Sequence, residues 1–257
     1  MATRDSHRRI TQAAVLCGGK GTRLSDVTQD AVPKALVEVC GRPLLAWHLD
    51  LLRRHGAEDV ILCTGFLSEA IEARFGEGGD FGVRLRYARE PLALGTAGAL
   101  AQVPFDLAAN LFVVYGDVFV NVDLARMAAF HAEKGGEATL LVHPSGHPYD
   151  SDLVQRDEGS GRITGFPGRP KPGTEFVNLT SAGLYAIRRT LVTHIPTDRA
   201  TDFARDIFPA RLSAGAALYA YRSDEYVHDL GTPERYDRVC ADVRRMIDQR
   251  TGSLFGP

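Results

Sequence analysis

The sequence predicts an α/β fold in which helices cover both faces of a mainly parallel sheet. Three short apolar runs suited to buried strands alternate with segments whose apolar residues recur at helical spacing. This alternation is typical of βαβ units, whose crossover helices cover the sheet. Strands are expected at residues 13–17, 60–64 and 111–115, and helices at residues 43–55, 68–75 and 124–134.

The expected helix at residues 43–55 shows the pattern plainly. Its apolar residues Leu44, Trp47 and Leu51 recur every three or four positions, and Gly56 follows where a C-terminal glycine cap belongs. We therefore expect a structural helix whose tryptophan lies in the core.

The second half of the chain changes to short strand candidates separated by turns rich in glycine and proline. They are expected at residues 139–143, 153–156, 162–166, 183–187 and 218–222. We expect them to form a small antiparallel extension that carries binding loops. The 257 residues show no internal repeat or linker, so one domain is expected over residues 1–257, with its core at about 13–245.

Composition excludes several classes of protein. The formal net charge of -2 leaves no excess of cations for a polyphosphate backbone, so no nucleic acid partner is expected. Four widely spaced cysteines form no zinc motif and are interpreted as reduced thiols. The polar N-terminal stretch has no apolar segment behind it, and no apolar run is long enough to span a bilayer. We expect a cytoplasmic protein with no membrane partner.

A glycine-rich turn follows the first expected strand directly. Its glycines allow backbone N–H groups to approach an anion closely. The spacing fits neither a P-loop nor the dinucleotide-binding turn, which also argues against a dehydrogenase. A hydroxyl and two cations nearby would serve the same anion. The residues of this expected triphosphate site are Gly18, Gly19, Gly21, Thr22, Arg23 and Lys34.

The segment GGKGTRL at 18–24, followed by VPKALVEVCGRPLL at 32–45, resembles the signature of the sugar-phosphate nucleotidyltransferases. The resemblance implies a Rossmann-like three-layer α/β/α nucleotide-diphospho-sugar transferase fold with a small antiparallel sugar-binding extension. It also implies that the chain joins a nucleoside triphosphate to a sugar 1-phosphate and releases pyrophosphate. In that family the glycine loop and Thr22 hold the triphosphate, Arg23 stabilises its developing charge, and Lys34 faces the phosphates.

A second nucleotide segment is implied at residues 90–99, which resemble the family's stretch beside the base. Gly95 and Thr96 are the candidate contacts, and Leu16 and Glu90 are expected around the base. An ordinary helix N-terminus capped by threonine is the alternative interpretation.

Two carboxylates are candidate Mg²⁺ ligands. Asp117 follows a strand at the edge of the sheet where ligands of open α/β folds bind, and Asp229 lies in a segment that resembles the family's late D-x-G-T motif. We expect the two to converge and hold Mg²⁺, although an aspartate in either position alone is more often a turn or cap residue than a metal ligand.

Residues 167–172 resemble the family's E-K-P segment, which implies that Lys171 holds the phosphate of the sugar 1-phosphate. Pro170 stands where the family has an acidic residue. Ser181 stands where the family has an asparagine, and Asn178 is the candidate that compensates for it or serves a turn.

The stretch HPYDSDLV at residues 147–154 resembles heptose-1-phosphate guanylyltransferases and their close relatives. This likeness implies a manno-configured sugar, a heptose 1-phosphate first, with GTP as the nucleotide. Asp150 and Asp152 would accept hydrogen bonds from sugar hydroxyls, unless they only cap a turn. Mannose or another hexose 1-phosphate, and ATP or another triphosphate, stay open.

The chemistry implied by the resemblance needs no general base, because a phosphate monoester with a second pKa near ~6 is already ionised near neutral pH. Three histidines near the expected site, His143, His147 and His228, are therefore given no proton-transfer role. A non-catalytic regulatory subunit of the same fold is the rival hypothesis. The sequence carries no clear signal of oligomeric state and is compatible with a homo-oligomer.

Overall fold

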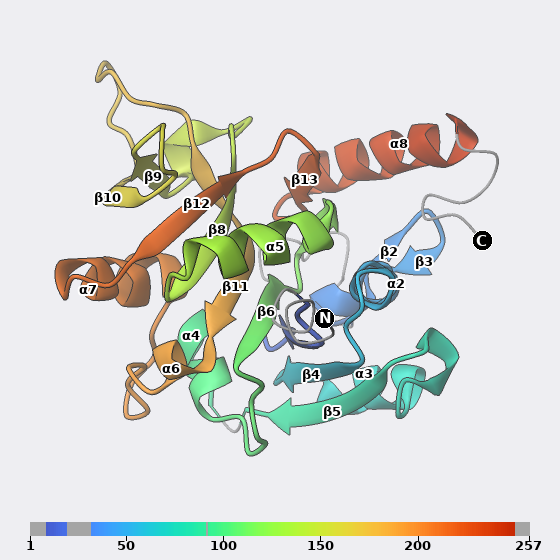
Figure 1. The fold of residues 1–257 in the computed structure, drawn as a ribbon. Coiled ribbons are helices and arrows are strands. Elements are labelled where there is room, and N and C mark those ends of the chain that lie inside the picture. The colour runs from blue at the N-terminus through green and yellow to red at the C-terminus, as the bar shows by residue number, and fades with distance from the viewer. Residues whose placement is uncertain (1–8, 20–31, 91, 250–257) are drawn as a thin grey trace, which may run out of the picture.

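The computed structural model describes residues 9–19, 32–90 and 92–249, and a mixed central sheet organises it (Figure 1). The strand β11 runs antiparallel to both of its neighbours, β6 and β8, and every other pairing along the main path is parallel. In spatial order this path consists of β12 (Leu218–Arg222), β8 (Ala138–His143), β11 (Thr180–Arg188), β6 (Asn110–Tyr115), β1 (Gln12–Leu16), β4 (Asp59–Thr64) and β5 (Arg84–Arg89).

The predicted strands are present, but the later ones are distributed differently from the expectation. Three of them, β8, β11 and β12, join the central sheet, because the long strand β11 pairs with β6 through its second half. The antiparallel extension is a hairpin of β9 (Leu153–Arg156) and β10 (Ile163–Gly168), which meets β11 at Thr180. This hairpin widens the sheet on the side away from β5.

Two small sheets and several helices complete the fold. The small sheets pair β2 (Glu38–Val39) with β3 (Arg42–Pro43), and β7 (Val118–Asn121) with β13 (Tyr226–Asp229). The α-helices are α2 (Leu44–Arg54), α3 (Ser68–Phe75), α4 (Gly95–Ala101), α5 (Leu124–Lys134), α6 (Arg189–Val192), α7 (Phe208–Ser213) and α8 (Pro233–Gln249). Short 3-10 turns occur at Lys34–Leu36, Gly79–Phe81 and Pro148–Asp150, and a π-helical turn spans Phe203–Ile207.

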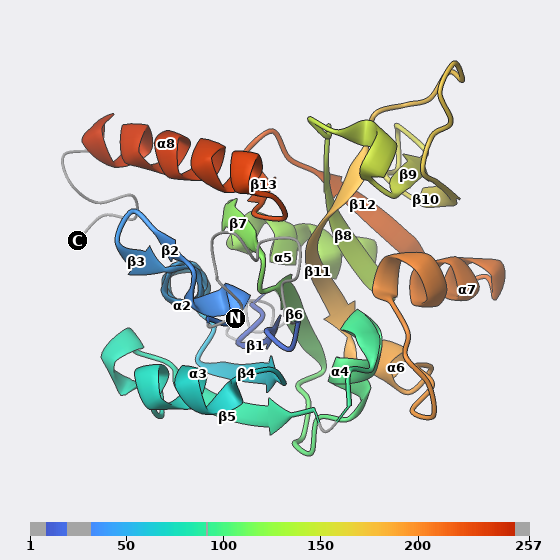
Figure 2. The ribbon, with the colours of Figure 1, turned by 180° about the vertical axis from the view of Figure 1, so that it is seen from behind.

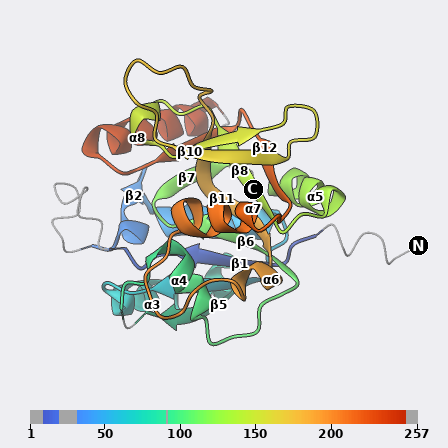
Figure 3. The same ribbon diagram turned by 90° about the vertical axis from the view of Figure 1, so that its left-hand side faces the viewer.

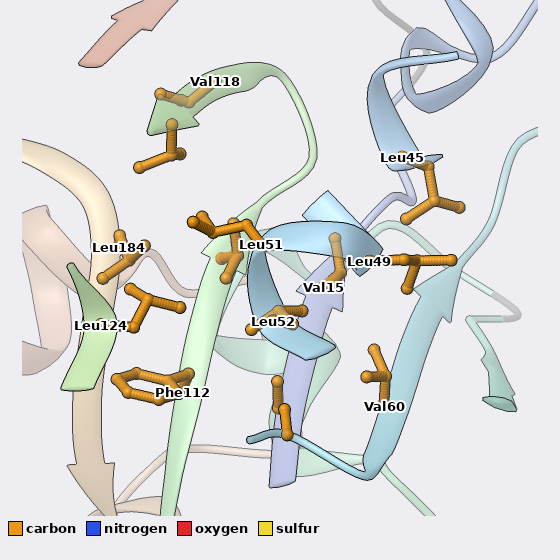
Figure 4. Close-up of a cluster of buried hydrophobic side chains, with 14 of the residues drawn as sticks. Val15, Leu45, Leu49, Leu51, Leu52, Val60, Phe112, Val118, Leu124 and Leu184 are labelled. Atoms are coloured by element: carbon orange, nitrogen blue, oxygen red, sulfur yellow. The ribbon is translucent and has the colours of Figure 1, made fainter. Parts of the chain in front are cut away.

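Helices cover both faces of the sheet, which confirms the three predicted layers (Figure 2). Successive side chains of a strand point to opposite faces, so Val15 packs under α2, α3 and α5 while Ala14 packs under α4 and the π-helical turn. Figure 4 shows Leu49 and Leu52 of α2 lying against Val15 and Val60. Both layers are apolar and buried, which fixes the strand ends that carry the site.

The order of connections places a crevice between two strand ends. The chain runs from β1 outward through β4 to β5, and then returns to β6 on the other side of β1. In such sheets ligands bind at the carboxyl ends of the strands where the direction of winding reverses. Gly116, just beyond β6, donates a backbone hydrogen bond to Leu16 O at 3.0 Å, so the two strand ends lie directly side by side.

The C-terminal helix α8 packs beside this edge of the sheet. Its buried residues Val239 and Val243 contact Trp47 of α2 and Phe119 of β7. This packing brings the first turn of α8 close to β13. None of the helices in the described ranges is long and apolar enough to cross a membrane.

Candidate active site

A cavity of about 530 Å³ opens at the carboxyl ends of β1 and β6. Figure 3 shows β10 and α8 on one side of the central sheet and α3 and β5 on the opposite side. Twelve residues predicted from the sequence line the cavity: Leu16, Gly18, Gly19, Lys34, Glu90, Gly95, Thr96, Asp117, Asp150, Asp152, Ser181 and Asp229. Three others, Gly21, Thr22 and Arg23, lie outside the described residues, and their roles stay predictions.

One end of the cavity is built on the first glycines after β1, where the sequence predicts the triphosphate site. Cys17 donates a backbone hydrogen bond to Cys63 O at 2.7 Å, and Glu90 donates one to Thr64 O at 2.7 Å. A Cβ atom at Gly18 would collide with the carboxylate of Glu90. Burial raises the pKa of the Glu90 carboxyl above its usual value. A hydrogen bond with the Leu94 backbone acts in the opposite direction but does not outweigh burial. Glycine at position 18 therefore leaves room for the carboxylate of Glu90 beside the start of this glycine segment.

The Gly95–Thr96 segment at the start of α4 is braced from across the molecule. Thr201 donates its backbone N–H to Leu94 O at 2.8 Å and accepts from Ala97 N at 3.0 Å. The Thr96 hydroxyl donates to Asp202 Oδ2 at 2.7 Å and accepts from Tyr115 OH at 3.1 Å. Because these bonds occupy the hydroxyl, a nucleotide would meet Thr96 mainly through its backbone.

We expect Gly95→Ala to lower the free energy of unfolding by about 2 kcal/mol or more, because Gly95 has a φ of +78° and a Cβ there would collide with Thr201 O. Gly173→Ala is the matched control, since Gly173 has a φ of +79° and open space around it. It should cost about 1 kcal/mol, the backbone strain alone. Thermal unfolding of both variants measures the difference, and equal costs would contradict the bracing.

Lys34 neutralises the carboxylate that follows β6. The ammonium of Lys34 lies 3.0 Å from Asp117 Oδ2, and its side chain is 15% exposed. Pro33 precedes the 3-10 turn that carries Lys34, and this turn points the lysine across the crevice at the end of β6. An anion in the cavity would therefore meet a cation already held beside Asp117.

A closed ring of charged side chains lies on the other wall. His147 lies between two carboxylates, with Nδ1 2.6 Å from Asp150 Oδ1 and Nε2 2.9 Å from Asp229 Oδ2. Arg235 binds the same two, with Nη2 2.6 Å from Asp150 Oδ2 and Nη1 3.0 Å from Asp229 Oδ1. Burial raises the pKa of Asp229, but hydrogen bonds from Arg235 and from the Gly231 N–H outweigh it, so its pKa is lowered. The ring ties the loop before β9 to β13 and α8.

The two predicted metal carboxylates lie on adjoining segments. Asp229 pairs with Val118 in the small sheet, and Leu230 donates a backbone hydrogen bond to Asp117 O at 2.9 Å. Within the described ranges, no three His, Cys, Asp or Glu side chains gather as a complete metal site. Mg²⁺ commonly takes only one or two carboxylates together with substrate phosphates and water. Asp117 and Asp229 fit that pattern. The assignment of these two residues as magnesium ligands stays a prediction.

The far end of the cavity is lined by arginines that the sequence did not single out. Arg205 Nε lies 2.9 Å from Asp152 Oδ2, and Arg169 Nε lies 3.9 Å from Asp152 Oδ1. Ser181 donates its hydroxyl to Tyr185 OH at 3.1 Å. Both arginine side chains are more than half exposed, so each is accessible to an anionic ligand.

Two predicted residues do not line the cavity. Lys171 is exposed on the loop beyond β10, and Arg169, two positions earlier, lines the cavity. The Asn178 side chain donates to Ser145 O at 2.9 Å and accepts from Ser145 N at 3.0 Å. It therefore holds the loop that carries His147 and serves the turn that was the alternative interpretation.

Arg235 is the site residue most clearly missed. It stands in the first turn of α8, where a cation is unfavourable to the helix dipole. Such a placement is a signal that the residue serves contacts outside its own helix. His143 and His228 also line the cavity, and burial lowers the pKa of His143 to about 4, which keeps it neutral.

Known proteins resemble the chain over most of its length. Mannose-1-phosphate guanylyltransferase of Mycobacterium tuberculosis is 35% identical over 237 residues, which cover 91% of this chain and 65% of the relative. UTP–glucose-1-phosphate uridylyltransferase of Synechocystis is 29% identical and covers 92% of this chain and 64% of that relative. The chain thus spans a little under two thirds of the length of these relatives.

The fold is shared with solved structures. HddC from Yersinia pseudotuberculosis superposes with a TM-score of 0.76 at 20% identity, over 91% of this chain and all of that chain. A second structure of the same protein is complexed with GMP-PN. The sequence model of the nucleotidyl transferase family matches residues 12–245. Because that match covers nearly the whole described chain, including the strand ends around the cavity, the chain belongs to the nucleotidyl transferase family.

Proposed function

We propose that this chain transfers a nucleotidyl group from a nucleoside triphosphate to a sugar 1-phosphate and releases pyrophosphate. One observation carries the proposal. A single cavity is lined by the glycines after β1, by the Lys34–Asp117 pair and by Asp229. Its far end, which we call the sugar end, is lined by Arg169 and Arg205. That arrangement has room for two phosphate-bearing substrates end to end. A non-catalytic relative would have no need to keep these charged groups directed at one space.

The reaction needs positioning more than proton transfer. An oxygen of the ionised sugar phosphate attacks the α-phosphorus, and the bond from that phosphorus to the β-bridging oxygen breaks as pyrophosphate leaves. Both substrates are anions, so cations must hold them in line and stabilise charge on the transferred group. Lys34, which lines the described cavity, would hold the triphosphate. Arg23 is predicted to do the same. Arg169 and Arg205 are the described cations accessible to the sugar phosphate.

Asp117 and Asp229 would hold Mg²⁺ in this site. The metal would supply charge neutralisation at the phosphoryl oxygens. Lys34 and Arg235 balance the two carboxylates, so the site keeps its shape around the charge. This balance offsets the charge of two acidic side chains carried by adjoining segments.

For substrates, we propose GTP and a manno-configured sugar, with heptose 1-phosphate preferred. The HPYDSDLV stretch supports the heptose, and the guanylyltransferase from Mycobacterium tuberculosis supports the guanine base. Mannose 1-phosphate is the second candidate, because it is named for that same relative. The uridylyltransferase relative makes UTP the nucleotide that most needs to be compared.

The test is pyrophosphate release by the purified chain, measured with four nucleoside triphosphates against heptose, mannose and glucose 1-phosphates. We expect GTP with heptose 1-phosphate to give the highest kcat/KM, followed by mannose 1-phosphate. Best activity with glucose 1-phosphate and a pyrimidine triphosphate would refute the substrate assignment while keeping the reaction class. Absence of sugar-dependent pyrophosphate in every combination would refute the class.

A further inference from the structure

A second, smaller cavity of about 150 Å³ adjoins the sugar end of the main one. The two cavities share four lining residues, Asp152, Ser181, Ala204 and Arg205. The remaining lining of the side cavity is mostly apolar and consists of Leu153, Val154, Phe166, Gly168 and Pro209. The side cavity thus has a polar mouth facing the main cavity and an apolar floor behind it.

Gly168 borders this space and has no side chain of its own. A Cβ added at Gly168 meets no heavy atom within 4 Å, although the residue lies in β10 and lines the side cavity. Leu153 and Val154 of the neighbouring strand β9 are buried beneath it. A side chain at position 168 would therefore extend into open space at the border of the side cavity without displacing neighbouring atoms.

The polar mouth has hydrogen-bonding capacity to spare. Asp152 uses Oδ2 to bind Arg205 at 2.9 Å, whereas its Oδ1 lies 3.9 Å from Arg169 Nε, too far for a hydrogen bond. This oxygen can accept from a ligand hydroxyl. Arg205 donates only its Nε to Asp152, so its terminal nitrogens are the donors left for the same ligand.

We propose that the side cavity is the subsite for the exocyclic chain of the sugar and selects a sugar 1-phosphate with more carbons than a hexose. This inference rests on the proposed function. A heptose carries one more CH(OH) group than a hexose, and a group of that size needs little more than the ~30 Å³ of a water molecule. Its carbon atoms would contact the apolar floor, and its hydroxyls would meet Asp152 and Arg205 at the mouth.

The experiment compares Gly168→Asn with Gly173→Asn. Both glycines have a φ near +77°, at +75° and +79°, and asparagine is the side chain that best tolerates this conformation. Only Gly168 lines the side cavity, so Gly173→Asn controls for the backbone strain. The kcat/KM of each variant is measured with heptose 1-phosphate and with mannose 1-phosphate, and calorimetry measures the binding of both sugars.

The wild-type chain should prefer heptose 1-phosphate by about tenfold or more, the discrimination typical of one added carbon unit in a fitted pocket. Gly168→Asn should remove that preference in both turnover and binding by weakening the heptose alone, and Gly173→Asn should keep it. Equal use of both sugars by the wild type, or an equal loss for both sugars in Gly168→Asn, would overturn the subsite. Absence of turnover with every sugar phosphate would overturn the proposed function, and the subsite with it.

Discussion

Replacing Asp117 by asparagine is expected to lower the Mg²⁺-dependent kcat by about 100-fold or more, and Asp229→Asn should do the same. Each substitution removes a charge that would hold the metal beside the transferred phosphoryl group, and such electrostatic contributions are commonly worth several kcal/mol. Turnover at saturating triphosphate and sugar phosphate measures the effect. Titration of Mn²⁺ as a probe of the metal site should show weaker binding in both variants.

Asp224→Asn is the matched control, because the Asp224 side chain is 83% exposed and lies outside the cavity. It should leave turnover and Mn²⁺ binding unchanged. Unfolding curves of all three variants separate loss of the metal site from loss of the fold. A folded Asp117→Asn or Asp229→Asn variant with near-normal turnover would show that the metal is held elsewhere.

Arg235→Ala is expected to raise the KM for the sugar phosphate by roughly tenfold to 100-fold, or ~1.4–2.7 kcal/mol. Arg235 joins Asp150 to Asp229, and its loss leaves these two carboxylates linked only through His147. The loop before β9 would then be tied to β13 only through the contact of His147 with Asp229. Steady-state kinetics with each substrate varied in turn measures the change.

Arg235→Lys should restore only part of the affinity, because an ammonium cannot form the two parallel bonds that a guanidinium makes. Arg238→Ala is the control on the next turn of α8, since that side chain is 65% exposed and its Nε lies 3.9 Å from Asp242 Oδ2. Equal behaviour of Arg235→Ala and Arg238→Ala would contradict the role of the ring.

The elements found from the sequence are those whose apolar pattern is uninterrupted. The strands β1, β4 and β6 are buried on both faces and therefore show continuous apolar runs. The edge strand β5 was missed because three of its six residues are arginines, two of which, Arg84 and Arg86, pair with Asp59 on β4. Helix α8 was missed because only Val239 and Val243 are buried along its 17 residues.

The site also contains residues that could be predicted from the sequence and residues that could not. Asp117 and Asp229 could be predicted to lie on adjoining segments, because Asp117 follows a strand and the order of the two along the chain resembles a known signature. The ring around His147 and Arg235 could not, since it depends on how α8 begins relative to β13 and on the fold of the loop before β9. The open space at Gly168 depends on packing between β10 and the π-helical turn, which no local pattern encodes.

The most direct test of the account is the identity of the products formed from GTP. The chain is incubated with GTP, Mg²⁺ and heptose 1-phosphate, and phosphorus NMR follows every phosphate species with time. Nucleotidyl transfer predicts equal amounts of pyrophosphate and a guanosine diphospho-sugar, formed only when the sugar phosphate is present. Release of inorganic phosphate with GDP, or pyrophosphate that forms without the sugar phosphate, would contradict it.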